Sequence, residues 1–413
     1  MTQYSYGCTQ AKLTQRNYHM GRSSCSDMTR LLIIQPYIPS YRVPLFSSMK
    51  QQLSANGIEL AIAAADPGDE QRQRGDDYTD LCADFKLQSR QVSLARRTLL
   101  WRDLSPALEA HQPDLIIVEQ AVKNLESVGP LLSQRFGSRP QVAMWGQGRS
   151  YSTRQTPLEA GFKQWLTQRS SWFFAYTPAG AEHVVSRGFP SDRVTILWNS
   201  NDAEALQRDL ATLTSEDVEA FRRKLGLEYG RTGLFIGGVD QRKGISFLVA
   251  SARLVAESLP GFKLLVGGTG DMAEAVRAEE SSGGPVRMLG RIDGRQKALA
   301  LAASDVLMIP QWIGLVAVDA LVAKKTLVTT DHPSHSPEIE YLTFGVNAFT
   351  TSHDPTSYAR TVVRCLSETC SLSEPASAGA LTETRLGIST MANNFVEGIE
   401  LWRTQCKLEG ELK

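Results

Sequence analysis

Two glycine-rich turns and a lysine have the residue types best suited to binding chemistry in this chain. Residues 234–249 read as a strand, the turn Gly237-Gly238-Val239-Asp240-Gln241-Arg242-Lys243-Gly244, and a helix. A glycine after a strand lets the backbone approach a ligand closely, the next helix N-terminus favours anions, and Lys243 adds a positive charge. A second turn, Val266-Gly267-Gly268-Thr269-Gly270-Asp271, also follows a strand and opens a helix. Both turns fit a phosphate-bearing ligand, and both also fit plain connections.

An acidic residue on a third segment could recognise a ribose. A strand ends at Pro310, and the helix after Gly314 would carry Asp319 inward from its second turn. A carboxylate there can accept hydrogen bonds from both hydroxyls of a ribose. The alternative is a buried helix whose Asp is satisfied by neighbouring backbone. The dinucleotide fingerprint and its later acidic residue are not met together, and no G-x-x-x-x-G-K-[ST] occurs, so neither of those nucleotide-binding classes applies.

These segments lie in a chain that alternates short apolar runs with longer amphipathic segments, the pattern of strand-helix units around a parallel sheet. The pattern predicts an α/β protein with two similar doubly wound domains in tandem. The first series of expected strands is Leu31–Gln35, Ile58–Ala63, Phe85–Val92, Leu115–Val118, Gln141–Trp145, Trp172–Ala175 and Arg193–Leu197. The second is Gly233–Ile236, Phe262–Val266, Val286–Leu289, Asp305–Ile309, Thr326–Thr330 and Val346–Phe349.

The domain boundaries follow from these series and from the polar ends. Residues 1–27 are polar and lack an apolar signal-peptide core, so we expect a disordered extension or an upstream start, with Met28 as an alternative start. The first domain is expected over 28–198 and the second over 199–385. Residues 386–413 read as a last helix, which we expect to cross back to the first domain.

Composition excludes several classes of function. The 413 residues carry 44 Lys+Arg against 44 Asp+Glu, which removes the basic excess expected of a nucleic-acid binder. The 6 cysteines are scattered and match neither a redox pair nor a zinc site, so reduced thiols in the cytoplasm are expected. The apolar runs are far shorter than the roughly 20 residues that cross a bilayer.

Taken together, the three segments resemble the C-terminal half of retaining glycosyltransferases of family 4, which have the GT-B fold of two Rossmann-like domains facing a cleft. G-G-V-D-Q-R-K-G, G-G-T-G-D, V-R-M-L-G-R-I, A-A-S-D-V-L-M-I-P and G-L-V-A-V-D-A-L fall in register with that family. In the first half, L-L-I-I-Q-P-Y-I-P-S-Y-R-V-P-L-F and Y-T-P-A-G-A-E-H-V-V-S-R-G-F-P resemble members that make surface polysaccharides or glycosylated metabolites. The likeness covers nearly everything from Met28 to about Phe395.

The resemblance implies a role for each matching residue. Lys243 matches the lysine that holds the donor diphosphate, but the arginine usual five residues earlier is Gly238, and Arg242 could replace its charge. The family's two glutamates become Gln311 and Asp319, while Gln147 stands where relatives often carry a histidine. The implied catalytic set is Lys243, Gln311, Asp319 and Gln147. The implied donor-binding set is Gly237, Gly238, Arg242, Lys243, Gly268, Arg291, Gly314, Leu315, Asp319 and Glu338.

The acceptor side is less defined. Tyr37, Tyr41 and Arg42 follow the first strand and should face the cleft, where Tyr and Arg suit sugar stacking or anionic acceptors, although they could simply fold a Pro-rich turn. Arg149, after the strand that ends near Gln147, completes the expected acceptor set. Arg90, Arg96, Arg97 and Arg102 alternate with apolar residues and suit an anionic membrane surface, with a solvated helix as the alternative.

The expected activity is therefore transfer of a sugar, with retention, from a nucleotide-diphosphate sugar to a glycan, lipid-linked or small-molecule acceptor. The expectation includes no cofactor and no metal, because no D-x-D occurs and positive side chains would neutralise the diphosphate. It also includes a monomer or homodimer in the cytoplasm, with peripheral membrane contact as an option. The altered residues at Gly238, Gln147 and Gln311 leave open a catalytically weakened homologue that acts as a partner or regulatory subunit. A hydrolysing nucleotide-sugar epimerase on the same fold is a third alternative.

Overall fold

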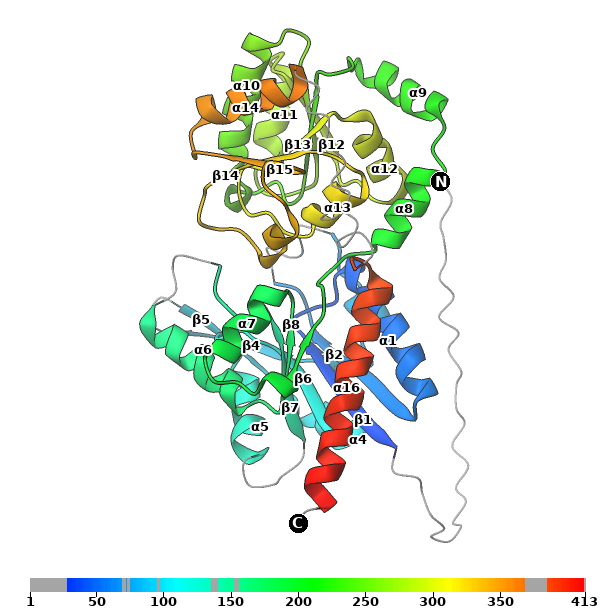
Figure 1. The fold of residues 1–413 in the computed structure, drawn as a ribbon, viewed down its shortest axis with the longest axis vertical. Helices are drawn as coiled ribbons and strands as arrows, with labels where there is room; N and C mark the ends of the chain where they lie inside the picture. Colours follow the sequence, from blue (N-terminus) through cyan, green and yellow to red (C-terminus); the bar gives the residue numbers. More distant parts are fainter. Residues whose placement is uncertain are drawn as a thin grey trace.

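The computed structural model describes residues 28–68, 72, 75–94, 97–134, 140–151, 156–367 and 385–411. These form two α/β domains stacked one above the other, with the first described strand and the C-terminal helix both in the lower one (Figure 1). The expected extension 1–27 lies outside the described residues. The prediction of two parallel-sheet domains is confirmed.

The N-terminal domain is built on a seven-stranded parallel sheet in the order β3-β2-β1-β6-β7-β8-β9. Its side chains alternate between two cores: Leu31 and Ile33 face one, and Leu32 and Ile34 face the other. This alternation follows from the period of two along a strand, and burial on both faces explains the continuous apolar runs. The strands are β1 (Thr29–Gln35), β2 (Ile58–Ala65), β3 (Phe85–Leu87), β6 (Leu115–Glu119), β7 (Gln141–Gly146), β8 (Trp172–Ala175) and β9 (Val194–Ile196).

Helices cover both faces of this sheet. On one face lie α1 (Val43–Ala55) and the C-terminal helix α16 (Ile388–Glu411), which pack side by side. The other face carries α4 (Ser105–His111), α5 (Val128–Ser133), α6 (Pro157–Arg169) and α7 (Pro178–Ser186). The remaining short helices are η1 (Ser40–Arg42), α3 (Thr79–Cys82), η2 (Leu125–Ser127) and η4 (Ser191–Arg193).

The C-terminal domain repeats the design with a six-stranded parallel sheet in the order β12-β11-β10-β13-β14-β15. Its strands are β10 (Thr232–Ile236), β11 (Lys263–Gly267), β12 (Val286–Gly290), β13 (Val306–Met308), β14 (Leu327–Thr330) and β15 (Ala348–Thr351). Its helices are α8 (Ala203–Ala211), α9 (Ser215–Leu225), η5 (Gln241–Lys243), α10 (Ile245–Ser258), α11 (Ala273–Ser281), α12 (Gly294–Ala303), α13 (Val316–Val322), η6 (Pro337–Tyr341) and α14 (Pro355–Ser367). One continuous apolar core joins them.

Helix α16 connects the two domains at its start. The carboxylate of Glu204, on α8, accepts hydrogen bonds from the backbone amides of Ile388 and Ser389 at 3.0 and 2.9 Å. An anion at a helix N-terminus satisfies amides that have no partner within the helix and opposes the helix dipole favourably. The rest of α16 buries Met391 and Phe395 in the N-terminal core, so this helix belongs to that domain by its packing.

The expectation for residues 85–102 is wrong in part. Phe85–Val92 is not one strand: β3 ends at Leu87, and β4 (Ser89–Leu94) leaves the sheet to pair antiparallel with β5 (Arg97–Arg102). The alternative of a solvated helix is thus wrong, because these residues form a hairpin. Arg102 is 2% exposed and pairs with the equally buried Glu126, so it cannot contact a lipid headgroup.

Of the other three arginines proposed as membrane contacts, two lie among the described residues. Arg90 lies exposed on β4, and Arg97 lies at the start of β5. Arg96 lies outside the described residues. Among the helices of the described ranges, none has the length and apolar composition needed to cross a bilayer.

Candidate active site

A groove with a volume of about 420 Å³ lies where the carboxyl ends of β10, β11 and β12 face the N-terminal domain. This edge of a parallel sheet is the usual place for ligands in α/β proteins. Ser40, Tyr41 and Asp76 supply the N-terminal wall. The C-terminal wall consists of Ile236, Gly237, Gly238, Asp240, Arg242, Lys243, Gly267, Gly268, Thr269, Arg291, Ile292, Asp293, Lys297, Trp312 and Asp319.

The two glycine turns lie in contact along the C-terminal wall. The Gly237 amide donates to the Gly267 carbonyl at 3.0 Å, and the Gly268 amide donates to the Gly290 carbonyl at 2.7 Å. Gly268 has φ +152°, and a Cβ there would collide with the carbonyl oxygen of Gly237. The sequence therefore needs glycine at this contact, which gives a wall of bare backbone that a ligand can approach closely.

Lys243 lies at the point where the first turn enters α10. The carboxylate of Asp240 accepts from the Lys243 amide at 3.1 Å and caps the short helix η5. The Lys243 ammonium donates to the Trp312 carbonyl at 2.6 Å, while Arg242 pairs with Asp240 at 3.4 Å. Two cations therefore line the groove beside the glycine turn.

Asp319 lies in the groove wall on the first turn of α13 and is 5% exposed. One of its oxygens, Oδ1, receives both the Lys297 ammonium at 2.9 Å and the Asn201 side-chain amide at 3.0 Å. No described residue donates a hydrogen bond to Oδ2. The paired charge makes burial of this carboxylate tolerable, and Oδ2 is left as an acceptor for a hydroxyl.

Sequence reasoning missed Lys297 and Asp240. Lys297 lies on α12, one turn into the helix that follows Arg291, and its spacing gives no sign that it reaches Asp319. Asp240 could have been found as the Asp that precedes a short helix by one residue, a common N-cap position.

Arg291 connects the two walls. It follows β12, donates to the backbone carbonyl of Gly75 in the N-terminal domain, and lies 3.5 Å from the Ser40 hydroxyl. Its Nε is also 3.4 Å from Asp293. The structure therefore places Arg291 in the groove as predicted, but as a bridge between the domains.

Three predicted site residues, one from the catalytic set and two from the donor-binding set, lie behind the groove wall. Gln311 is 9% exposed, and its amide donates to the Gln241 carbonyl at 3.3 Å. A Cβ on Gly244 would lie 2.8 Å from that same amide, so Gln311 packs directly against the turn that carries Lys243. Gly314 and Leu315 lie just before α13, in the segment that brings Asp319 to the groove.

Glu338 lies in a buried contact between the domains. It is 3% exposed and accepts a hydrogen bond from the Asn199 side chain, which in turn accepts from Arg42 at 2.7 Å. Burial raises the pKa of the Glu338 carboxyl, while the Asn199 hydrogen bond and the charges of Arg42 and Lys243 oppose this rise. Glu338 therefore helps to fix the two domains relative to each other.

The backbone before α13 is held by a histidine. His335 Nδ1 accepts from the Ile313 amide at 3.2 Å, and its Nε2 lies 3.2 Å from the Thr330 carbonyl. Burial is the main cause that lowers the pKa of His335, and nearby His332, Lys243 and His353 lower it further. The neutral ring with a proton on Nε2 fits both contacts.

The predicted acceptor residues are dispersed. Tyr41 lines the groove, whereas Tyr37 is 9% exposed and lies 3.4 Å from Asp76. Arg42 is 4% exposed and stacks on Trp145 behind the groove. Gln147 lies after β7, where its carbonyl is close to Gly180, and Arg149 pairs with Glu340 across the domains at 3.0 Å. Their acceptor and catalytic roles stay predictions.

Among the described residues, no three His, Cys, Asp or Glu side chains lie together in a way that could hold a metal ion. The groove instead offers bare backbone and both kinds of charge: its four cationic side chains are Arg242, Lys243, Arg291 and Lys297, and its four carboxylates are Asp76, Asp240, Asp293 and Asp319. Chemically, this set suits an anion joined to a polyhydroxy group.

Comparison with known proteins agrees with this chemistry over part of the chain. Residues 230–368, which carry most of the groove, match the family described as "Glycosyl transferases group 1". A phosphatidyl-myo-inositol mannosyltransferase of Mycolicibacterium smegmatis is 34% identical over 107 residues, which are 25% of this chain and 28% of that protein. The chain thus spans less than a third of the length of this curated relative.

The fold comparison extends over nearly the whole chain. The Anabaena protein HepE in complex with UDP-glucose has a TM-score of 0.64 at 16% identity, covering 90% of this chain and 99% of that one. The UDP-GlcNAc 2-epimerase of Neisseria meningitidis, bound to UDP-GlcNAc, has a TM-score of 0.57 at 14% identity, covering 90% of this chain and 99% of that one. The chain therefore has a GT-B fold, and its C-terminal domain matches the group 1 glycosyltransferase family, as the motifs predicted.

Proposed function

We propose that this protein is a glycosyltransferase that takes its sugar from a nucleoside-diphosphate sugar bound in the groove between the domains. The observation that carries the proposal is the joint placement of the glycine turns, Lys243 and Asp319 around one groove of about 420 Å³. The match of residues 230–368 to group 1 glycosyltransferases supports it.

The groove suggests a pose for the donor. Its diphosphate lies against the backbone of Gly237 and Gly268, with Lys243 and Arg242 neutralising the charge in place of a metal. Its ribose hydroxyl donates to Oδ2 of Asp319. The sugar then lies toward Tyr41 and the N-terminal wall, where the acceptor enters.

We propose transfer with retention, in which the acceptor oxygen attacks the same face that the diphosphate leaves. The bond from the anomeric carbon to the phosphate oxygen breaks, the bond to the acceptor oxygen forms, and the acceptor proton passes to the leaving phosphate. Lys243 stabilises the charge that develops on that phosphate. Gln311 holds the turn that carries Lys243 in place. Its contact with Gly244 supports this positioning role over direct stabilisation of charge in the transition state.

The acceptor class is the less constrained part of the proposal. A glycan, a lipid-linked molecule or a small molecule with a hydroxyl would each fit an open groove bounded by Tyr41 and Ser40. The similarity to a phosphatidyl-myo-inositol mannosyltransferase makes a mannosyl donor and a phospholipid-type acceptor the first pair to assay.

The test is release of nucleoside diphosphate from GDP-mannose, UDP-glucose and UDP-GlcNAc, each with and without candidate acceptors, in the intact protein and in Lys243→Ala. Acceptor-dependent release that disappears in Lys243→Ala supports the proposal. Nucleotide binding without any turnover would favour the catalytically weakened homologue, to which Gly238, Gln147 and Gln311 point. Conversion of UDP-GlcNAc without an acceptor would instead indicate the epimerase.

A further inference from the structure

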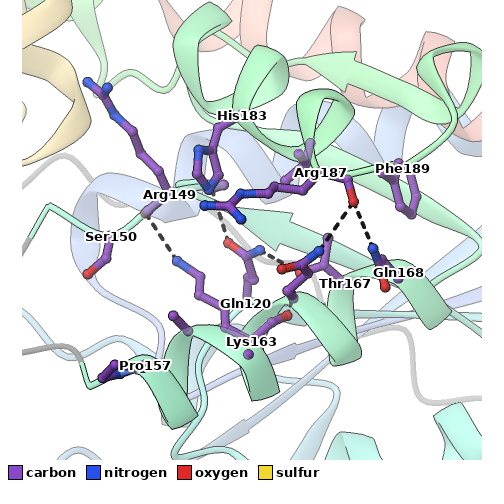
Figure 2. Close-up of a pocket in the computed structure, with 15 residues that line it drawn as sticks. Gln120, Arg149, Ser150, Pro157, Lys163, Thr167, Gln168, His183, Arg187 and Phe189 are labelled. Carbon is purple, nitrogen blue, oxygen red and sulfur yellow. Dashed lines mark hydrogen bonds between the residues drawn. The ribbon is translucent and has the colours of Figure 1, made fainter.

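A second cavity, of about 320 Å³, lies within the N-terminal domain between α6 and α7 (Figure 2). The loop after β7, residues 148–150, closes one side of it, and Phe189 lies at the other side. It shares no lining residue with the groove between the domains. Nothing in the proposed transfer uses it.

The cavity is lined by basic side chains from three separate elements. Lys163 comes from α6, His183 and Arg187 come from α7 and its C-terminal cap, and Arg149 comes from the loop after β7. Figure 2 shows the guanidinium of Arg187 lying beneath the His183 ring. No Asp or Glu lines the cavity among the described residues.

The positive charges are held without a carboxylate partner inside the cavity. The Lys163 ammonium donates to the backbone carbonyl of Arg149 at 3.1 Å, which is a neutral partner. Arg149 turns its guanidinium away to Glu340 in the other domain, at 3.0 Å. No described carboxylate lies within ion-pair distance of Lys163, His183 or Arg187.

The titration of two of these groups reflects the same surroundings. Burial lowers the pKa of Lys163 to about 8. Burial also lowers the pKa of His183, and the charges of Arg187, Lys163 and Arg149 lower it further, with no acidic residue opposing them. A partly buried ammonium beside other cations is unfavourable in an empty cavity and becomes favourable once an anion enters.

The other polar side chains of the lining are three amides and two hydroxyls, and the rest of the lining is apolar or glycine. The carbonyl of Arg187 accepts from Gln164 at 3.3 Å and from Gln168 at 2.7 Å, which ties the end of α7 to α6. Gln120 donates to the Thr167 hydroxyl at 2.7 Å, and its oxygen accepts from the Gly148 amide at 3.0 Å. These contacts fix the backbone of the cavity walls, so an incoming anion would meet Lys163 already positioned, while the exposed Arg187 side chain can turn toward it.

We propose that this cavity binds a phosphate group carried by a small polar molecule or a lipid headgroup, with Lys163 and Arg187 as its main contacts. Arg187 can bind two phosphate oxygens at once, and Lys163 adds a point charge. The volume is at the low end for ligand pockets, which suits a phosphate with a small polyhydroxy group. The adjacent amides can bind hydroxyls of such a group.

The test is calorimetric titration of the full chain with inorganic phosphate and with glycerol 3-phosphate. Free phosphate could also enter the groove between the domains, so Lys243→Ala serves as the background for every titration. Lys163→Gln and Arg187→Gln remove one charge each from the cavity, and Lys123→Gln removes an exposed charge of the same domain as the matched control. We expect each cavity variant to weaken binding by about tenfold or more, since a hydrogen bond to a charged group is lost, and the control to leave it unchanged.

A readout without any cavity substitution guards against variants that fail to fold. Proton NMR of the His183 ring should show its pKa rising when glycerol 3-phosphate is added, because a bound anion offsets the three nearby cations. Vesicles with and without an anionic phospholipid distinguish the two sources of phosphate. Vesicle binding that is lost in Lys163→Gln identifies a lipid headgroup as the ligand. Binding of glycerol 3-phosphate without any vesicle binding identifies a soluble ligand.

The proposal is overturned if no phosphate compound binds the Lys243→Ala protein, or if Lys163→Gln and Arg187→Gln bind as well as the control. The result is independent of the proposed transferase activity. With Lys243 intact, Lys163→Gln should still bind nucleotide, and in the Lys243→Ala background it should lose phosphate binding; this pair of results would separate the two sites. If the protein binds phosphate in this cavity but binds no nucleotide, the phosphate site is supported and the proposed transferase function is not.

Discussion

Replacing Lys243 by Ala should weaken nucleoside-diphosphate binding while leaving the fold intact. The ammonium lies beside the glycine turn: a Cβ on Gly237 would be 3.8 Å from Nζ, and Nζ donates to the Trp312 carbonyl at 2.6 Å. A diphosphate against Gly237 would therefore come within hydrogen-bond reach of Lys243. A hydrogen bond to a charged group contributes about 1.5–3 kcal/mol, which corresponds to a loss of about 10- to 150-fold in affinity.

The assay is calorimetric titration of UDP and GDP into the wild type, Lys243→Ala and Lys224→Ala. Lys224 is exposed at the end of α9 and lines neither cavity, so it matches the loss of charge without touching the groove. The control should bind like the wild type. A Lys243→Ala protein that binds the same nucleotide within about twofold of the control would refute the placement of the diphosphate, because no charged contact would then have been lost.

Three further predictions concern groups that position the site or the first domain. Lys297→Met should leave the buried Asp319 carboxylate without its cation and lower the free energy of unfolding by about 3 kcal/mol. Adding Asp319→Asn to the same chain should recover part of this loss in thermal unfolding. If the losses of the two single variants simply add in the double variant, the two side chains are not coupled. His335 has a lowered pKa, so the unfolded chain takes up its proton first as the pH falls below about 6.5, and stability should decline there. Urea midpoints at pH 7.5 and 5.5 measure this loss, and His335→Asn should reduce it. Arg102→Met should cost about 3–5 kcal/mol by stranding Glu126, as measured by urea unfolding, and a cost below about 1 kcal/mol would show that the pair is replaceable.

The sheet strands were predictable because their apolar runs are buried on both faces. Leu31 to Ile34 form a continuous apolar run, and the structure divides the run between two cores by alternation. The hairpin β4-β5 was not predictable in the same way. Its strands form a separate sheet, and β5 is joined through Arg102 to Glu126 on η2, a contact that the strand pattern does not indicate.

The groove was predictable where backbone shape requires a residue type. Gly268 lies at a contact between two turns where a Cβ would collide with the Gly237 carbonyl oxygen, and glycine at such a turn is visible in the sequence. Lys297 was not predictable, because its role depends on how α12 packs against α13.

The buried contacts of Arg42 and Glu338 were likewise hidden from the sequence. Arg42 was expected to face the cleft because it follows the first strand, and Glu338 was expected to bind the donor because of the family resemblance. The way the two domains meet buries both around Asn199. The second cavity was missed for the same reason, since Lys163 and Arg187 come together only through the packing of α6 against α7.

The most direct test of the central claim is thermal unfolding of the purified protein with UDP, GDP, dTDP and ADP added separately. A nucleotide at 100 times its dissociation constant stabilises by about 2.7 kcal/mol, which raises the melting temperature of a domain of this size by about 5–10 °C. We predict such a shift for one of the four nucleotides and its loss in Lys243→Ala. Equal melting temperatures with all four nucleotides would contradict the claim that this groove binds a nucleoside diphosphate.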